Sequence, residues 1–352
     1  MTTYKIASFF SGAGGLDLGF AKAHLTDASV PNGTDPDLGF AQAGFETVFA
    51  NDIWKGCHET FEKNHGLTVF KKSITDIVPG DIPEVSGFIG GPPCQSWSAL
   101  GKKAGIADPR GKLFWTYLDL IDKKRPAFFL AENVAGMLFP RYKGELQKII
   151  SAFESIGYNV SFKLLNAKDF GVAQERKRVF IVGYNKDIMG DKKFEFPVPF
   201  SAENRITLRD AIGDLPPAIM AGEKDHTLDQ AFNNEYTRGK FSSHFMSTNR
   251  AKRWDQQAFT VAASAQAISI HPSAPEMIRL GHYNFKFVSG SEHLYRRLSV
   301  RECARIQTFP DDFIFKYKSV SDGYRMVGNA VPVKLAEAIA KKILINLEEI
   351  AT

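Results

Sequence analysis

A cysteine preceded by two prolines is the residue best suited to chemistry in this chain. Pro92 and Pro93 stiffen the backbone directly before Cys94 and hold its thiol at a fixed point. A thiolate is a strong nucleophile, and the glycine-rich basic loop that follows favours covalent chemistry on a nucleic acid. A buried structural cysteine is the alternative, and the flanking prolines favour the nucleophile.

Two further motifs offer acid–base and anion-binding groups. Glu132 follows an apolar stretch at residues 128–130, so its carboxylate is expected at a strand end, where an acid can hold a proton on a substrate. Gln174, Arg176 and Arg178 alternate, which places their side chains on one face of an extended segment. The two arginines are expected to bind a phosphate or a base carbonyl, or else to form a solvated edge.

A glycine-rich turn and an acid together indicate a nucleoside-containing cofactor. Residues 9–15, Phe-Phe-Ser-Gly-Ala-Gly-Gly, follow the first expected strand and open a helix, so a ligand can approach the backbone closely. Asp52 follows the second expected strand, where a carboxylate can accept hydrogen bonds from ribose hydroxyls. A tight structural turn and a helix N-cap are the alternative interpretations of these two features.

The elements that position these groups alternate between strands and helices. Helices are expected between the strands, for example at 113–123 and 144–155. The strands are predicted at residues 5–10, 46–50, 87–90, 127–131, 159–165 and 179–184. This alternation predicts an α/β fold, with a doubly wound, mostly parallel sheet that binds ligands at the carboxyl ends of its strands.

The character of the chain changes from about residue 192, where prolines and polar stretches replace the alternation. We predict a sheet domain of residues 1–190 plus 322–352 and a smaller, irregular domain of residues 191–321. Apolar residues at helical spacing predict a last helix at 333–349, which packs back on the sheet domain.

Composition excludes several classes of protein. Of the 352 residues, 44% are hydrophobic and 24% are charged, which excludes a disordered chain and predicts a sizeable core. No apolar run is long enough for a membrane helix, and the three cysteines have no metal-binding spacing, so we expect reduced thiols in a cytoplasmic protein. The net charge of +5 is mild, but the basic residues cluster, which fits either a protein that binds a polyanion or ordinary solvated surface charge.

One short repeat marks an insertion. Residues 17–23, Asp-Leu-Gly-Phe-Ala-Lys-Ala, return almost unchanged at 37–43, and the polar segment Thr26–Pro36 lies between them. Twenty residues is too little for a solenoid repeat, so we interpret this segment as an inserted loop.

These motifs together resemble those of the DNA cytosine-5 methyltransferases. The resemblance is strongest to the HaeIII-type enzymes, which modify the inner cytosine of GGCC. The motifs that carry the resemblance occur in family order between residues 6 and 340. They are Phe10-Ser11-Gly12, Pro92-Pro93-Cys94-Gln95, Glu132-Asn133-Val134, Gln174 with Arg176 and Arg178, Arg297 with Arg301, Glu302 and Gln307, and Gly328-Asn329-Ala330-Val331-Pro332.

The resemblance implies a reaction for the residues above. A cytosine leaves the duplex, and the Cys94 thiolate adds to its carbon 6. Glu132 hydrogen-bonds N3 and the exocyclic amine, and Arg178 contacts O2, with Arg176 on backbone phosphate. Carbon 5 then accepts a methyl group from S-adenosylmethionine, without a metal.

The resemblance also implies two sets of binding residues. The cofactor residues are Phe10, Ser11, Gly12, Ala13, Gly14, Gly15, Asp52, Ile53, Ser73, Ile74, Pro92, Leu113, Asn329 and Val331. The DNA-binding residues are Gln95, Ser96, Ser98, Lys102, Lys103, Arg110, Arg250, Arg253, Ser264, Gln266, Arg296 and Arg297. The implied partner is double-stranded DNA at the bacterial nucleoid, with a cognate restriction endonuclease in the same system and no membrane contact, and we expect a monomer.

The chain departs from the family pattern at two positions. Ser73 stands where the family commonly has an aspartate for the adenine amino group, so a weaker hydrogen bond to the cofactor is expected. Gln266 stands where GGCC enzymes similar to this one carry an arginine. Arginine reads guanine and glutamine suits adenine, so a GC-centred target with altered outer bases is an alternative to GGCC.

Two other functions stay open from the sequence. A transfer-RNA cytosine methyltransferase of the same superfamily has a much shorter target region than the one here, between Arg178 and Arg297. An inactive, DNA-binding regulator with this fold is disfavoured by the presence of Cys94, Glu132 and Arg178, although Ser73 and the insertion leave it open.

Overall fold

The computed structural model describes residues 2–25, 43–93, 111–221, 232–237, 241 and 245–351. The chain divides into two compact units. Unit 1 comprises Met1–Leu165, Lys177–Val198 and Leu335–Thr352, and unit 2 comprises Asn166–Arg176 and Pro199–Lys334. Residues 166–176 and 322–334 therefore group with unit 2, whereas the domains expected from the sequence place them with the sheet.

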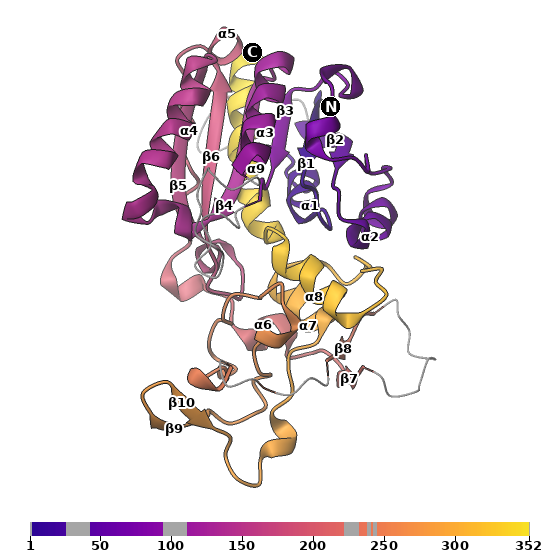
Figure 1. The fold of residues 1–352 in the computed structure, drawn as a ribbon, viewed down its shortest axis with the longest axis vertical. Helices are drawn as coiled ribbons and strands as arrows, with labels where there is room; N and C mark the ends of the chain where they lie inside the picture. The colour runs from indigo at the N-terminus through magenta and orange to yellow at the C-terminus, as the bar shows by residue number, and fades with distance from the viewer. Residues whose placement is uncertain are drawn as a thin grey trace, which may run out of the picture. The chain divides into compact units, whose positions relative to one another are not determined.

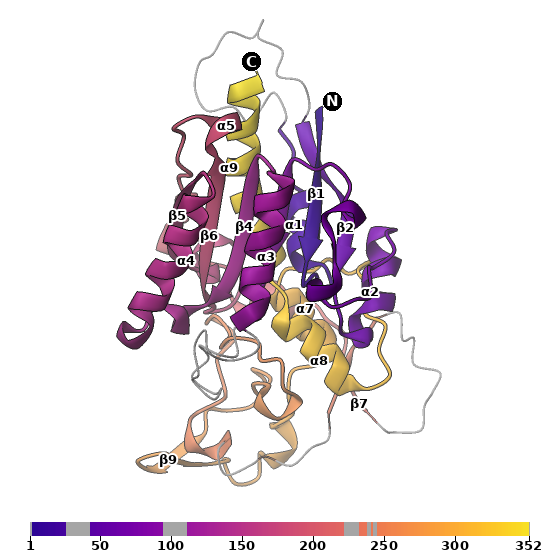
Figure 2. The ribbon, with the colours of Figure 1, turned by 45° about the horizontal axis from the view of Figure 1, so that its top comes forward.

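Unit 1 is built on a six-stranded sheet in the order β2-β1-β3-β4-β6-β5 (Figures 1 and 2). β1 pairs in parallel with β2 and β3, and β3 pairs in parallel with β4, whereas β6 runs antiparallel to β4. The strands are β1 (Thr2–Phe9), β2 (Ala43–Asn51), β3 (Gly87–Gly90), β4 (Phe128–Val134), β5 (Tyr158–Asn166) and β6 (Lys177–Asn185). The predicted α/β fold with a mostly parallel sheet is confirmed, and all six predicted strands are present.

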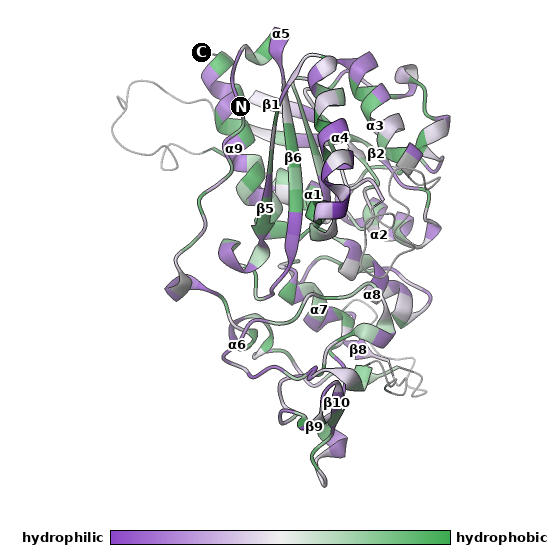
Figure 3. Ribbon diagram, turned by 60° about the vertical axis from the view of Figure 1, so that its left-hand side comes forward, coloured by the Kyte–Doolittle hydropathy of each residue, from purple (hydrophilic) through white to green (hydrophobic). Residues whose placement is uncertain are grey.

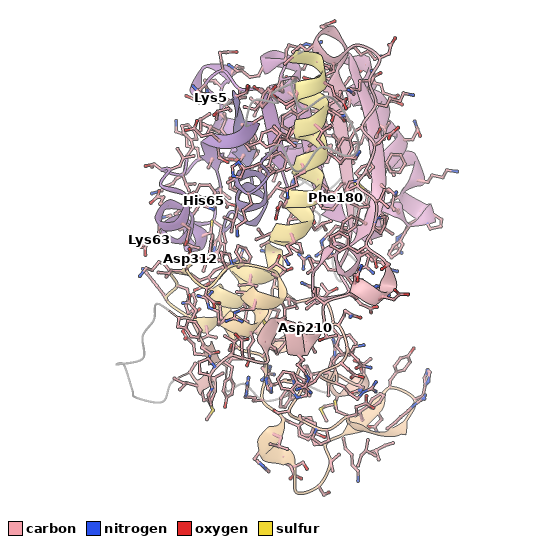
Figure 4. The ribbon with its side chains drawn as sticks, turned by 180° about the vertical axis from the view of Figure 1, so that it is seen from behind. Lys5, Lys63, His65, Phe180, Asp210 and Asp312 are labelled. Carbon is pink, nitrogen blue, oxygen red and sulfur yellow. The ribbon has the colours of Figure 1, made fainter. Side chains whose placement is uncertain are left out.

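Helices lie on both faces of this sheet. α3 and α4 cover the face toward the viewer in Figure 1, and α9 covers the opposite face, seen in Figure 4. The helices of unit 1 are α1 (Gly15–Ala21), α2 (Lys55–His65), α3 (Gly111–Lys124), α4 (Lys143–Ser155), α5 (Lys186–Met189) and most of α9 (Val333–Ala351). The predicted docking of the last helix is observed, because Tyr4 donates a hydrogen bond to Glu348 over 2.7 Å and Tyr184 donates one to Asn346 over 2.9 Å.

Aromatic packing fills the space between the sheet and α3 and α4. The Phe9 ring lies 4.9 Å from Phe88 and 5.5 Å from Tyr117, and Phe129 stacks on Phe153 at 4.0 Å. α4 buries Leu146, Ile149, Ile150 and Phe153, a spacing that places all four on one helix face. Figure 3 shows that β6 is hydrophilic at its start and hydrophobic in its middle part.

Unit 2 has little regular structure. Its longer helices are α7 (Val300–Ile306) and α8 (Val320–Asn329). The remaining elements are α6 (Leu208–Ile212) and the two-stranded sheets of β7 (Ile219–Met220) with β8 (Glu235–Tyr236) and β9 (Ile278–Gly281) with β10 (Asn284–Lys286). Buried Arg301 links loops of this unit by donating to the carbonyls of Phe232, Pro310 and Phe313. None of the described helices in either unit is long and apolar enough to cross a membrane.

Replacing Gly87 with alanine is expected to destabilise unit 1 by about 1–3 kcal/mol, because the interior there is already filled. A Cβ atom on Gly87 would lie 2.0 Å from Phe128 Cζ, and Phe128 is itself held between Phe20 and Phe45. Gly80→Ala is the matched control, since a Cβ atom there meets nothing within 4 Å. Thermal unfolding measures both variants, and equal melting temperatures would contradict this packing.

Candidate functional site

The glycine-rich turn leaves β1 in a conformation that few residues adopt. Phe10, Gly12 and Gly14 have φ angles of +54°, +56° and +84°. For a phenylalanine this left-handed backbone is uncommon, so the surrounding structure must hold it. The Gly14 amide donates to the Ser11 carbonyl over 2.9 Å, and the Ser11 amide donates to the Asn51 carbonyl at the end of β2 over 3.0 Å.

Asp52 ties the glycine-rich turn to the segment after β2. Its Oδ2 accepts a hydrogen bond from the Gly12 amide over 2.9 Å, and its Oδ1 accepts one from the Trp54 amide over 2.7 Å. Trp54, rather than Asp52, is the N-cap of α2, so the helix-cap interpretation of Asp52 was wrong. The carboxylate is half-buried at the carboxyl ends of β1 and β2, where the ligand of a parallel sheet is expected.

The open side of the turn fits a cofactor. A Cβ atom on Gly12 would meet nothing within 4 Å, although Gly12 sits directly beside the Asp52 carboxylate. Ile53, next to Asp52, is 65% exposed, which is unusual for so apolar a side chain and suits a surface that a ligand covers. These residues therefore fit a nucleoside whose ribose lies at Asp52.

The other cofactor residues expected in unit 1 surround the same strand ends. Ser73 begins a short 3₁₀ helix, Ile74–Asp76, and its hydroxyl accepts from Thr75, so its free hydrogen-bonding capacity is reduced. Ile74 is 2% exposed, and the half-buried Phe10 and Leu113 pack against the apolar core that includes Ile74. Ile74, Phe10 and Leu113 thus share one apolar cluster, and their assignment to the cofactor, like that of Ser73, stays a prediction.

An ion pair stands at the carboxyl end of β4. Arg178 Nε lies 2.9 Å from Glu132 Oε1, and both side chains are mostly buried, at 15% and 12% exposure. The antiparallel register explains this contact, because Arg178 lies opposite Val134, two residues beyond Glu132. A carboxylate with one oxygen on an arginine keeps its second oxygen for a substrate proton.

The segment that leads to the cysteine meets the same strand end. Asn133 Nδ2 donates to the Pro92 carbonyl over 3.3 Å, and a Cβ atom on Gly91 would lie 3.4 Å from Glu132 Oε2. Pro92 is buried, so the backbone two residues before Cys94 is held against the Glu132 motif. Outside the described residues lie Cys94, Gln95, Ser96, Ser98, Lys102, Lys103, Arg110 and the insertion Thr26–Pro36.

Arg176 does not share the surroundings of Arg178. It belongs to unit 2 and is 1% exposed, and its guanidinium donates to the carbonyls of Val261, Gly328 and Ala330 over 2.8–3.2 Å. The expectation of a phosphate contact from Arg176 is therefore corrected: its donors satisfy buried carbonyls. Extended geometry predicted a shared face with Arg178, but the chain passes from unit 2 to unit 1 between them.

Arg176 belongs to a buried polar network that holds the expected target-recognition segment. Gln174 Oε1 accepts from the Val261 amide over 2.8 Å, and its Nε2 donates to Gln307 Oε1 over 2.6 Å. Gly328 is required where α8 meets the same segment, since a Cβ atom there would lie 2.3 Å from the Ala262 carbonyl oxygen. Burial and these bonds fix the start of the segment.

The middle of that segment is exposed. A short 3₁₀ helix, Ala265–Ala267, follows the exposed Ser264, and Gln266 on this helix is also exposed. The far end is fixed again, because Ile268 is 1% exposed and the Ile270 amide donates to the Arg250 carbonyl over 3.1 Å. Unit 2 thus presents Ser264 and Gln266 between two anchored ends, as a base-reading segment requires.

The four arginines expected to contact DNA from unit 2 all have partners within the protein, and their exposure differs. Arg296 makes two hydrogen bonds to buried Glu302, at 2.6 and 2.9 Å, and Arg297 is 2% exposed with its guanidinium over the Phe241 ring. Arg250 is half-buried over Phe245, and burial lowers its pKa. Arg253 is exposed but pairs with Asp255 and Glu276.

These contacts correct the interpretation of Arg296 and Arg297 as DNA contacts. Their positive charges are partnered by a buried carboxylate and an aromatic ring, so they support the fold of unit 2. Arg253 remains accessible, although the hydrogen bond with Asp255 raises its pKa and partly neutralises its charge. Asn329, the exposed last residue of α8, and buried Val331 also belong to unit 2, and their assignment to the cofactor stays a prediction.

Comparison with known proteins decides the family. A family model described as C-5 cytosine-specific DNA methylase matches residues 4–345. The chain belongs to this methylase family. Type II methyltransferase M.MthTI of Methanothermobacter thermautotrophicus is similar at 55% identity over 346 residues, 97% of this chain and 98% of that protein. M.NgoPII of Neisseria gonorrhoeae is 47% identical over 356 residues, 99% and 98% of the two chains.

Solved methyltransferase structures share the fold at low identity. Entamoeba histolytica EhMeth has a TM-score of 0.69 at 16% identity and covers 99% of both chains. S. pombe Dnmt2 has a TM-score of 0.62 at 18% identity, covering 99% of this chain and all of its own. The family resemblance seen in the sequence is confirmed, and the methylase is an enzyme that uses S-adenosylmethionine and acts on cytosine in DNA.

Sequence reasoning missed three groups of this methylase, two of which contact the candidate cofactor turns while the third interacts with one of those two. They are Asp17 of α1 and His58 and His65 of α2, all buried or half-buried. The signal was available, because His58 and His65 are seven residues apart on a helix that starts directly after Asp52. Residues with that spacing lie on one helix face.

Arg176→Ala is expected to lower the unfolding free energy by about 3 kcal/mol or more, because three buried carbonyls lose a charged donor. Lys177→Ala is the matched control: Lys177 is the exposed neighbour, and its loss is expected to cost less than about 0.5 kcal/mol. Denaturant unfolding measures both variants. A stable Arg176→Ala protein with weakened DNA binding would instead support the phosphate contact.

Proposed function

We propose that this methylase is a restriction–modification enzyme that methylates carbon 5 of the inner cytosine of GGCC, or of a related GC-centred palindrome. The observation that carries the proposal is the Glu132–Arg178 ion pair, beside which Asn133 holds the backbone that leads to Cys94. The Type II designation of M.MthTI and M.NgoPII supports the restriction–modification role.

Cys94 is the proposed nucleophile. Its thiolate forms a bond to carbon 6 of a cytosine that has left the duplex, and electron density moves toward carbon 5. Cys94 later leaves carbon 6 as the proton on carbon 5 is removed, which restores the aromatic ring. Pro92 and Pro93 keep the thiol in place through both steps.

Glu132 and Arg178 stabilise the attacked base. Glu132 hydrogen-bonds N3 and the exocyclic amine, and so favours a proton on N3 while Cys94 attacks. Arg178 holds O2 and, through its contact with Glu132 Oε1, orients the carboxylate. Because both side chains are mostly buried, these interactions act with little competition from water.

The turn between β1 and α1, together with Asp52, holds the cofactor in this proposal. Asp52 accepts the ribose hydroxyls, Ile53 covers the adenine, and the open face of Gly12 admits the ligand close to the backbone. Bound S-adenosylmethionine supplies the methyl group for carbon 5. Ser73 replaces the usual aspartate, so a moderate cofactor affinity is expected.

Unit 2 reads the target in this proposal. The exposed Ser264 and Gln266 face the bases, and the segment's anchored ends limit the entropy lost on binding. The protein acts as a monomer on nucleoid DNA in the cytoplasm, with a cognate endonuclease cutting the unmodified site. The Type II designation of the relatives supports the endonuclease partner in this proposal.

A duplex with 5-fluorocytosine at the inner position of GGCC is expected to become covalently attached to the enzyme in the presence of S-adenosylmethionine. Fluorine replaces the proton that must leave carbon 5, so the bond from Cys94 persists. Denaturing electrophoresis detects the adduct, and Cys94→Ser, with a far weaker nucleophile, is expected to form none. An adduct with the serine variant would contradict the role of Cys94.

Gln266→Arg is expected to shift the preferred outer base pair toward guanine by at least tenfold in kcat/KM, since a bidentate guanine contact discriminates by about 1–3 kcal/mol. Methylation rates on duplexes that differ only in the outer base pairs measure the shift. Gln257→Arg is the matched control on the same unit, since its amide donates to the Ile206 carbonyl. Unchanged preference in the Gln266 variant would remove this residue from base reading.

A further inference from the structure

Helix α2 places three aromatic side chains on one face, toward the two turns that hold the cofactor in the proposed function. His58, Phe61 and His65 are spaced by three and four residues, which aligns them on the same side of the helix. Phe61 is fully buried and packs with Ala50 and Val69. The two histidines flank this anchor, one toward each turn.

His58 holds the segment after β2. Its Nε2 lies 2.8 Å from the Asp52 carbonyl oxygen, which can only accept, so the ring donates. The His58 side chain is buried, and the hydrogen bond that it donates fixes the backbone carbonyl of Asp52. His58 contacts only the backbone of Asp52, and the Asp52 carboxylate accepts the hydrogen bonds from the Gly12 and Trp54 amides.

His65, labelled in Figure 4, is the last residue of α2 and packs against the glycine-rich turn. Its ring stacks on Phe61 at 4.3 Å, and it reaches Gly14 so closely that a Cβ atom there would lie 2.0 Å from Nε2. Burial lowers the pKa of His65, and the nearby Asp17 and the adjacent backbone of Ala13 and Gly14 oppose that shift. Glycine is thus required at position 14 by the histidine as well as by the left-handed φ.

Asp17 completes the contact from α1. It is 1% exposed, and Thr47 of β2 donates to its Oδ1 over 3.2 Å. Burial raises the pKa of Asp17, and the nearby His65 lowers it again. A buried carboxylate is stable only with such partners, so Asp17 favours a fixed position for the His65 ring.

We propose that His58 and His65 are positioning residues for the cofactor, with α2 acting as a brace that sets the spacing between the glycine-rich turn and Asp52. Neither histidine needs to touch S-adenosylmethionine. Each holds backbone atoms, so the amide of Gly12 and the carboxylate of Asp52 are preorganised before the ligand arrives. The inference rests on the proposed function, in which these two turns bind the cofactor.

The test compares His65→Leu, which keeps bulk but has no hydrogen-bonding group, with His65→Gln, which returns a polar side chain of similar length. Calorimetric titration of the full-length protein with S-adenosylhomocysteine measures the cofactor Kd, and thermal unfolding reports on the fold. We expect His65→Leu to raise the Kd about tenfold and His65→Gln to restore it to within about threefold of the parent value. Affinity for a GGCC duplex without cofactor is expected to stay unchanged.

His24→Leu is the matched control. His24 is an exposed histidine that also lies against a glycine, with its Nδ1 2.9 Å from a Cβ atom built on Gly44, but at the start of β2 rather than at its end. The Kd of the His24→Leu variant for S-adenosylhomocysteine is expected to equal that of the parent protein. The same leucine and glutamine exchanges at His58 repeat the test at the other turn, so a folding defect in one variant does not end it.

The outcomes separate this inference from the proposed function through Asp52→Ala. A raised Kd for Asp52→Ala with parent-like binding by His65→Leu and His58→Leu would overturn the brace and leave the proposed cofactor site standing. Parent-like binding by all three variants would overturn both. Equal weakening by the leucine and glutamine exchanges, with a lower melting temperature, would show that the histidines only fill space and would overturn the positioning role.

Discussion

Parallel pairing of β1 with β2 and β3, and of β3 with β4, is the constraint on which the chemistry of this methylase depends. Strands that run in the same direction end at the same edge of the sheet. The segments that follow them therefore gather there: the glycine-rich turn after β1, Asp52 after β2, Gly91–Pro93 after β3, and the end of β4 with Glu132. No single segment contains a complete site, and the sheet assembles it.

The antiparallel strand β6 supplies the guanidinium of Arg178, which pairs with Glu132 of β4. Because β6 runs opposite to β4, its start lies beside the end of β4, and Arg178 meets Glu132 there. Two residues earlier the chain belongs to unit 2, where Arg176 satisfies three carbonyls under the expected recognition segment. One short motif thus contributes to an ion pair in one unit and to the anchoring of a loop in the other.

Local pattern was enough to predict the sheet and the segments of unit 1 that meet at its edge. Apolar strands, glycines and prolines report on backbone geometry, and strand ends in an α/β fold bring Asp52 and Glu132 to one edge. Burial of charge could not be predicted in the same way. The carbonyls that Arg176 satisfies lie 85 to 154 residues away in sequence, and the partner of Arg296 is the carboxylate of Glu302, which is itself buried.

Basic clusters in unit 2 illustrate the same limit. An arginine that packs on an aromatic ring, as Arg297 does on Phe241, looks in sequence like an arginine that binds phosphate. Only tertiary packing distinguishes a buried arginine of this kind from one that binds phosphate. The uncharged Gln266, by contrast, is exposed. His58 and His65 show the converse, since their spacing could be read from the sequence but their carbonyl and glycine partners could not.

In the proposed function, Cys94, Glu132 and Arg178 methylate carbon 5 of cytosine at a GC-centred target. Expression in a host that lacks cytosine methylation, followed by base-resolution mapping of 5-methylcytosine across its genome, tests that claim most directly. The account predicts 5-methylcytosine at the inner cytosine of GGCC or a related GC-centred palindrome, and at no other class of site. Absence of 5-methylcytosine with a folded protein in the cell, or methylation at sites without a GC centre, would contradict it.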